Sequence, residues 1–310
     1  MSSRDRLSDA LARFVVEGAG VRGAFASLDA CAREILACHP YPPALRRVLA
    51  ELLAAAALFA STLKFRGSLI VQLQGNGPLR MLVVECDATL ALRATAQWRP
   101  EAQSHPASTD LATLAGGAKD ARLVITLDPK DGGPLYQGIV ALEADSIAAL
   151  IEHYLVSSEQ IASRLVLASH ERGARGLLLQ RLPSAGPADD EIWQRASAIA
   201  AQLDPAALLA ADSAEQLLRE HFGELDLRLF KPLRARFACG CSKERIAVAL
   251  RSLGRLEVES ILTEQGMIGV TCEFCNRHYT FVASDARALF ERDTVDAADA
   301  PQPPPSTDAH

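Results

Sequence analysis

Residues 68–85, SLIVQLQGNGPLRMLVVE, carry the clearest fold signal in this chain of 310 residues. Apolar and polar side chains alternate on both sides of the central GNGP segment, residues 75–78, and this period of two is typical of half-buried strands. The two glycines permit the backbone angles that a tight hairpin needs. We therefore predict two adjacent antiparallel strands, with a third over residues 90–96.

The GNGP segment also contains a Gly-x-Gly pattern, which occurs in phosphate-binding loops. Such a loop needs a strand before it and a helix after it. Here a proline and a second strand follow, so the pattern favours a hairpin over a nucleotide site.

The hairpin lies within residues 1–182, where strand and helix patterns are mixed. A loosely alternating stretch, residues 7–27, turns at an EGAG segment and predicts another pair of strands. After Pro42 and Pro43, residues 44–63 are apolar around most of the helix circumference, which predicts a buried central helix. Further elements are expected as helices at 28–38 and 146–155 and as strands at 122–127, 135–142, 164–169 and 176–181. We predict the α+β class: a large N-terminal domain, residues 1–182, with a mainly antiparallel sheet packed with helices.

Residues 183–230 form a distinct, acidic segment after the PSAGP boundary at 183–187. They hold nine acidic and three basic residues, a net charge of −6. Spacings of four, three and four place Ile192, Ala196, Ile199 and Leu203 on one face of a helix that Asp204-Pro205 ends. A second helix is expected at 214–222, with Asp212 and Glu215 in a capping-box relation. Such short helices depend on packing, so we predict a metastable helical linker; an ordinary helical linker would show the same pattern.

Composition excludes several classes of protein. The longest apolar run, residues 52–60, is too short to span a bilayer, and the N-terminus lacks the apolar core of a secretory signal. We therefore expect a cytoplasmic protein with no membrane partner. Residues 1–182 contain no Ser-His-Asp spacing, Walker loop or paired histidine–carboxylate cluster, so no enzyme activity is expected.

Four of the seven cysteines lie together near the C-terminus, as the CxC pair Cys239 and Cys241 and the CxxC pair Cys272 and Cys275. Two short loops that each present two thiolates can form a tetrahedral zinc site. The two helices and the β-hairpin expected between and around the pairs are too small for a core of their own, so the metal would supply much of their folding free energy. We predict a C-terminal zinc domain, residues 231–292, followed by a disordered tail, residues 293–310. His278 is a rival ligand, but four sulfurs complete the shell.

The same four thiols could serve redox chemistry, but not while they hold a metal. Tetrahedral zinc keeps its sulfur ligands roughly 3.8 Å apart, whereas a disulfide needs about 2.05 Å. Oxidation would therefore break the site and release zinc. While zinc is bound, the basic neighbours of the cysteines are expected to offset the negative charge of the four thiolates, although each could equally be ordinary surface charge. These neighbours are Arg234, Arg236, Lys243, Arg245 and Arg277. The other three cysteines, Cys31, Cys38 and Cys86, are expected to be buried packing residues.

Several segments resemble the redox-regulated 33-kDa heat-shock chaperone family, over residues 6–292. The similar segments are KFRGSLIVQLQGNGPL, SSEQIASRLVLA, GLLLQRLP, CGCSKER, ALRSLGR and VTCEFCNRHYTF. The resemblance implies that Cys239, Cys241, Cys272 and Cys275 bind one zinc ion in a reduced, inactive state. It also implies that oxidation forms Cys239–Cys241 and Cys272–Cys275, ejects zinc, unfolds the linker and exposes an ATP-independent holdase surface. The partners would be unfolded client proteins, and the chain would be a monomer when reduced and a homodimer when oxidised.

Two other functions remain compatible with parts of the pattern. A zinc-ribbon module that binds nucleic acid is the main alternative, because residues 231–292 carry a net charge of +3. Four thiolates and one dication reduce this charge to +1, and Phe274, Tyr279 and Phe281 are few stacking platforms, so no nucleic-acid partner is expected. A thiol-disulfide oxidoreductase would need its CxxC at a helix N-terminus, whereas a hairpin is expected here.

The linker also suggests where clients would bind. Once zinc is lost, its apolar side chains would lose a packing partner. These side chains, or the surface of the first domain that they cover, would then become available for non-directional burial of client surface. These side chains are Ile192, Trp193, Ile199, Leu203, Leu208, Leu209, Leu217, Leu218 and Phe222.

Overall fold

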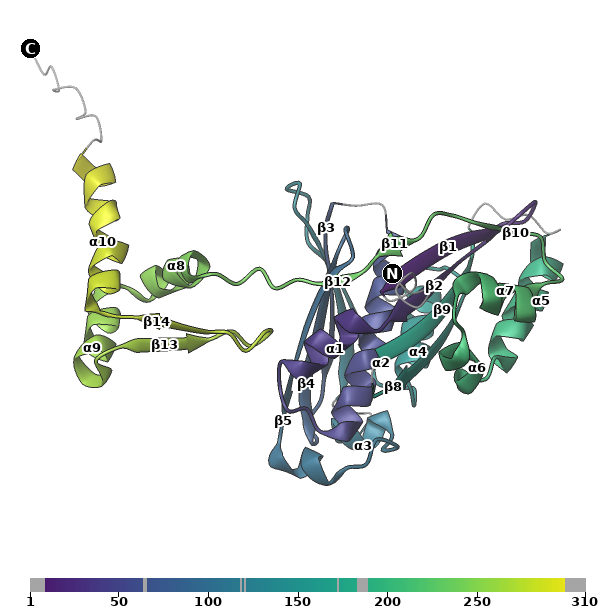
Figure 1. Ribbon diagram of the computed structural model, residues 1–310, viewed down its shortest axis with the longest axis horizontal. Helices are drawn as coiled ribbons and strands as arrows, with labels where there is room; N and C mark the ends of the chain where they lie inside the picture. Colours follow the sequence, from purple (N-terminus) through teal and green to yellow (C-terminus); the bar gives the residue numbers. More distant parts are fainter. Residues whose placement is uncertain are drawn as a thin grey trace, which may run out of the picture. The chain divides into compact units, whose positions relative to one another are not determined.

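A computed structural model describes residues 9–63, 66–117, 119, 121–171, 173–182 and 189–298. The expected boundary at 183–187 and the end of the tail lie outside these residues. The chain divides into a large unit, residues 1–239, and a small unit, residues 240–310 (Figure 1). Residues 227–237, which span the expected start of the C-terminal domain, contribute three short strands to the sheets of the large unit.

The first sheet of the large unit, sheet A, has the order β10-β1-β2-β9-β8, and β11 also pairs with β1. All its pairings are antiparallel. The turn between β1 and β2 lies at the predicted EGAG segment, where Gly18 has a φ of 69°. The strands are β1 (Ala10–Val16), β2 (Val21–Leu28), β8 (Ser163–His170), β9 (Gly173–Arg181), β10 (Leu227–Leu229) and β11 (Leu233–Arg234).

The second sheet, sheet B, has the order β12-β5-β4-β3-β6-β7. The predicted hairpin forms its centre, because β3 and β4 pair antiparallel from Ser68↔Asp87 to Gln74↔Met81. The α+β class with mainly antiparallel strands is confirmed. Among the residues that the structure describes in the large unit, the strands form two sheets, and only β12 runs parallel to its neighbour, β5. The strands are β3 (Gly67–Gln74), β4 (Leu79–Asp87), β5 (Ala91–Trp98), β6 (Arg122–Pro129), β7 (Tyr136–Ala141) and β12 (Arg236–Phe237).

Helix α2 (Pro43–Ala60) is the centre of the large unit (Figure 1). It contacts β2, β8 and β9 of sheet A and β3, β4 and β5 of sheet B, and almost every one of its residues is buried. Its burial confirms the buried central helix that the sequence predicted. Four further elements contribute buried side chains to the same core: α1 (Ala30–Ala37), α3 (Leu111–Ala115), α4 (Ile147–Ser157) and a 3₁₀ turn, η2 (Pro100–Ser104).

The three isolated cysteines differ in their surroundings. Cys31 and Cys86 are buried in this core, as expected, and burial raises the pKa of both thiols far above its usual range. Cys38 is only half-buried and donates a hydrogen bond to the Glu34 carbonyl oxygen at 3.3 Å. The two buried thiols are therefore chemically inert packing residues.

The linker helices cover the other face of sheet A. Helices α5 (Asp189–Gln202), α6 (Pro205–Ala210) and α7 (Ala214–Phe222) pack their apolar side chains against Phe14, Phe25 and Leu177 of the sheet. All nine linker side chains singled out in the sequence belong to or pack against this cluster. Sheet A is therefore covered on both faces.

Two local predictions for the linker were incomplete. Asp204-Pro205 ends α5 but also begins α6, because the Asp204 carboxylate accepts a hydrogen bond from the Ala206 N–H at 2.8 Å. The N-cap of α7 is Ser213 and not Asp212: its hydroxyl accepts from the Gln216 N–H at 2.9 Å. Asp and Ser are both strong N-cap residues. The sequence pattern assigned Asp204 to the end of one helix and not to the start of the next, and it placed the cap of α7 one residue too early.

The small unit has two helices, α8 (Lys243–Leu253) and α9 (Arg255–Gln265), and the predicted hairpin of β13 (Ile268–Thr271) and β14 (His278–Phe281). A further helix, α10 (Ala283–Ala298), extends into the segment expected to be a tail. The buried apolar residues of the described part are few: Leu250, Val258, Ile268, Phe281 and Ala286. Such a core is small for independent stability.

The predicted hairpin turn supplies a stability test. A Cβ on Gly77 would lie 2.3 Å from the Gly116 nitrogen and 2.6 Å from the Leu114 carbonyl oxygen, both backbone atoms. We expect Gly77→Ala to lower the free energy of unfolding of the large unit by about 1–3 kcal/mol, measured by denaturant titration. The control Gly133→Ala, where the nearest atom is a side-chain oxygen at 3.3 Å, should change it little. Equal stability of the two variants would contradict the close packing of this turn.

Candidate functional site: a four-cysteine centre

The four C-terminal cysteines converge on one point. Cys239 follows β12, Cys241 precedes the N-cap residue of α8, and Cys272 and Cys275 form the turn between β13 and β14. Their sulfur atoms all lie within 4.8 Å of one another. Two short segments that are far apart in the sequence thus bring four sulfurs to one place.

Local hydrogen bonds fix the two cysteine loops. In the CxxC turn, the Cys272 N–H donates to the Arg277 carbonyl at 2.9 Å, and the Asn276 N–H donates to the Cys272 carbonyl at 2.8 Å. Asn276 adopts a φ of 58°, a left-handed conformation that asparagine tolerates well. In the CxC loop, the Arg245 guanidinium donates to the Gly240 carbonyl at 2.7 Å. Hydrogen bonds within the protein thus hold both loops.

The spacing of the sulfurs suits a metal ion. Cys241 Sγ and Cys275 Sγ are 3.3 Å apart, far beyond the length of a disulfide bond, about 2.05 Å. Ligands of a tetrahedral thiolate site lie roughly 3.8 Å apart, as the Zn–S length of about 2.3 Å requires. The four sulfurs could therefore hold one soft divalent cation with small adjustments.

Tyr279 and Arg277 add hydrogen bonds and positive charge at one sulfur. The Tyr279 hydroxyl donates to Cys241 Sγ at 3.1 Å. A hydrogen bond with Tyr279, followed by the charges of Tyr279, Cys241 and Cys275, raises the pKa of Arg277. Arg277 was expected among the basic residues near the thiolates, whereas the part played by Tyr279 was missed.

Arg93, on β5, contacts the sulfur of Cys239. This contact was also not predicted from the sequence. Its Nε donates to Glu85 Oε2 at 2.8 Å, and its guanidinium hydrogen-bonds the Cys239 sulfur. Burial lowers the pKa of Arg93, but Glu85 and Cys239 more than offset this and leave the pKa above its ordinary value. β12 brings the two residues together, because the Ala238 N–H donates to the Leu92 carbonyl at 3.0 Å. No signal in the sequence links residue 93 to residue 239.

Other basic residues that the sequence placed near the thiolates have different partners. Arg236 donates to Thr89, and Lys243 forms an ion pair with Asp285 at 3.0 Å. His278, the rival ligand, is an exposed strand residue whose Nδ1 lies 3.1 Å from Thr271 Oγ1. It does not belong to the group of possible ligands.

The comparison with known families decides the relationship. The profile of the Hsp33 protein family matches residues 9–282. The chain belongs to the Hsp33 family. Among its relatives, the 33 kDa chaperonin of Chromobacterium violaceum is 43% identical over 94% of this chain and 96% of its own length. The 33 kDa chaperonin of Methylobacillus flagellatus is 42% identical, over 94% and 97% respectively.

A solved Hsp33 structure shows the same fold. The 33 kDa chaperonin of Thermotoga maritima covers 93% of this chain and is itself covered completely, with a TM-score of 0.77 at 20% identity. Within the described ranges, no helix is both long enough and apolar enough to cross a membrane.

The four-sulfur geometry predicts the behaviour of cysteine variants. We expect the reduced protein to bind one soft divalent cation per chain, and Cys239→Ser or Cys272→Ser to lose tight binding because three thiolates cannot complete the shell. Metal content after dialysis against a weak chelator measures this. Cys38→Ser, outside the cluster, is the matched control and should keep one equivalent. Stoichiometric metal in Cys272→Ser would contradict the arrangement.

Proposed function

We propose that this protein is an ATP-independent holdase chaperone controlled by oxidation of Cys239, Cys241, Cys272 and Cys275. The observation that carries the proposal is the convergence of these four sulfurs, the first of which, that of Cys239, lies shortly after the linker in the chain. Relatives that match almost the whole chain are named 33 kDa chaperonins, which supports a chaperone function. ATP independence agrees with the GNGP turn, which packs against the backbone of Ala115 and Gly116 and leaves no phosphate cradle.

In the reduced state the four thiolates would hold one zinc ion, which supplies the cross-link that the small core lacks. Arg93, Tyr279 and Arg277 would orient and partly neutralise the thiolates. The small unit would then be folded, and the linker helices would stay packed on sheet A. This is the inactive state of the proposal.

Oxidation would replace coordination by two covalent bonds, Cys239–Cys241 and Cys272–Cys275. Each bond forms when two thiolate sulfurs together lose two electrons to an oxidant such as hydrogen peroxide, which takes up two protons from the solvent and becomes two water molecules. The pairing rests on family membership and not on this geometry, because Cys241 and Cys275, whose sulfurs lie 3.3 Å apart, belong to different pairs. Disulfide sulfurs cannot stay at ligand spacing, so the metal leaves.

Loss of the cross-link would propagate through the chain to the linker. The small unit would lose stability, and the Arg93 hydrogen bond to the Cys239 thiolate would weaken when its charge disappears. Only two residues of β12 pair with β5, so little backbone pairing opposes release of this segment. The linker helices, which depend on packing, would then leave sheet A.

The released surfaces would bind unfolded clients. Trp193, Leu208, Leu217, Leu218 and Phe222 are buried against sheet A, and their exposure would uncover both the linker face and the sheet beneath it. Apolar surface of this extent binds clients without sequence preference. We further propose that it joins two copies in the oxidised state, whereas the reduced protein is a monomer, and that the protein acts in the cytoplasm.

The alternatives are less well supported. For a zinc-ribbon nucleic-acid module, Phe281 is buried in the small core and the Tyr279 hydroxyl is bonded to Cys241, which leaves few exposed stacking platforms. For an oxidoreductase, the CxxC lies in a hairpin turn and not at a helix N-terminus. We therefore propose neither enzyme activity nor nucleic-acid binding.

Trp193 provides a direct test of the switch. In a Trp98→Phe background, peroxide treatment should release one zinc ion, shift Trp193 emission to longer wavelength as the residue becomes exposed, and start suppression of client aggregation measured by light scattering. The reduced protein should show none of these changes. Equal suppression by the reduced zinc form and the oxidised form would refute redox control.

A variant should activate the protein without oxidant. Phe222→Ala removes a fully buried ring from the linker face, a loss of about 3–5 kcal/mol in packing, so we expect a protease-sensitive linker and holdase activity in the reduced state. Val156→Ala, at a side chain 53% exposed, is the control and should stay inactive. A Phe222→Ala protein with a cleavable linker but no activity would sink the proposal that linker release exposes the client surface.

A further inference from the structure

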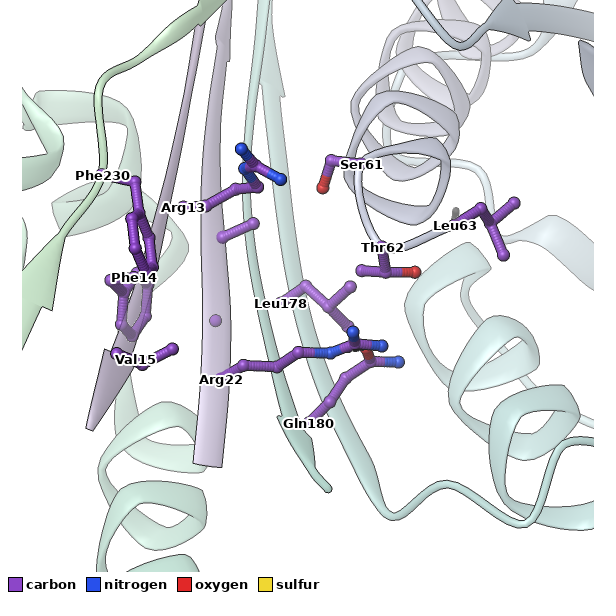
Figure 2. A pocket seen from close by; sticks show the side chains of 12 residues that line it. Arg13, Phe14, Val15, Arg22, Ser61, Thr62, Leu63, Leu178, Gln180 and Phe230 are labelled. Carbon is purple, nitrogen blue, oxygen red and sulfur yellow. Dashed lines mark hydrogen bonds between the residues drawn. The ribbon is translucent and has the colours of Figure 1, made fainter. Parts of the chain in front are cut away.

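A cavity of about 220 Å³ lies between sheet A and the C-terminal end of α2 (Figure 2). The sheet contributes Arg13 from β1, Arg22 from β2, and Leu178 and Gln180 from β9. Register places Arg22 directly opposite Val15 and Gln180, so these side chains share one face of the sheet. None of the residues that line the cavity belongs to the cysteine centre.

Two arginines carry uncompensated charge at this cavity. Arg22 Nε donates to Gln180 Oε1 at 3.0 Å, and Gln180 is itself fixed by a hydrogen bond of 3.3 Å to Ser163. Among the residues that the structure describes, neither the terminal nitrogens of Arg22 nor the guanidinium of Arg13 has a hydrogen-bond or ion-pair partner. Figure 2 shows the two guanidinium groups extending toward the end of α2 from neighbouring strands.

Capping of the helix does not account for these arginines. The carbonyl oxygens of Leu58 and Phe59, in the last turn of α2, accept hydrogen bonds from the hydroxyls of Ser61 and Thr62 at 2.6 and 2.8 Å. The donors of Arg22 and Arg13 are therefore available to a ligand. Burial also lowers the pKa of Arg22, because a half-buried cation is poorly solvated. An anion bound beside it would offset this cost.

The remaining walls favour a ligand with an apolar body. Val15, Ala24 and Leu178 contribute apolar side chains, and the hydroxyl hydrogens of Ser61 and Thr62 are already donated to the helix. An anion such as phosphate, which has oxygens on every side, would be repelled by the lone pairs of these two hydroxyl oxygens. A carboxylate carries its charge at one end only, so the rest of the molecule can be apolar. At about 30 Å³ per water molecule, the volume corresponds to roughly seven waters.

We propose that this cavity binds a small carboxylic acid with a compact apolar body. The carboxylate receives charge-assisted hydrogen bonds from Arg22 and Arg13, and the body lies against Leu178. Phe230 also lines the cavity, and its N–H donates to the Arg13 carbonyl at 2.9 Å. A bound acid thus contacts the segment that joins β10 to β11 and stabilises its attachment to β1.

Binding of phenylacetate to the reduced full-length protein tests this site. We expect a dissociation constant on the order of 1 mM by calorimetry and methyl NMR. The uncharged isostere phenylacetamide should bind at least tenfold more weakly, since it lacks the charge that the arginines recognise. Inorganic phosphate, which lacks the apolar body, should not displace phenylacetate at equal concentration.

Arginine variants locate the binding. Arg22→Gln and Arg13→Gln should each weaken phenylacetate binding at least tenfold. Arg13 is exposed, so its variant keeps the test valid if Arg22→Gln fails to fold. Arg122→Gln is the matched control, because the Arg122 Nε donates a hydrogen bond of the same type to Gln74 Oε1, at 2.7 Å, on sheet B. The Arg122→Gln protein should bind phenylacetate with unchanged affinity. Equal binding of acid and amide, full affinity in Arg13→Gln, or displacement by phosphate would each overturn the proposal.

Discussion

Apolar burial on both faces of sheet A is the constraint on which the rest of the structure depends. One face packs on α2 and, through it, on sheet B; the other packs on the linker helices. The first contact is made by one long helix enclosed in a large core, whereas the second is made by three short, separate helices. We therefore expect the two faces to differ in stability, so that in the proposed switch the face covered by the linker opens while the face packed on α2 keeps the sheets intact.

Much of the fold could be read from residue patterns because it depends on local signals. The period-two stretch around GNGP predicted β3 and β4, and the apolar helix after Pro42-Pro43 predicted α2. What local signals could not predict is how strands associate over long distances. The division into two sheets and the return of β10, β11 and β12 to the large unit depend on pairings across more than a hundred residues.

The candidate site was likewise predictable from local signals only in part. The spacing of Cys239, Cys241, Cys272 and Cys275 predicted their convergence, because short loops bring each pair together. Arg93 and Tyr279 could not be predicted as neighbours of the sulfurs, since only β12 pairing and the β13–β14 register place them there. Their contacts give each sulfur of the CxC pair, Cys239 and Cys241, a donor from outside its own loop, which a spacing motif cannot encode.

The position of β10 has a consequence for synthesis of the chain. Phe14 on β1 pairs with Leu229 on β10, so the outer edge of β1 stays unpaired until more than two hundred further residues have been made. At about 5–20 residues per second, this interval lasts roughly 10–40 s on the ribosome. An exposed strand edge of this kind is prone to pair with other chains. A nascent copy of this protein thus itself passes through an aggregation-prone state before its own sheet is complete.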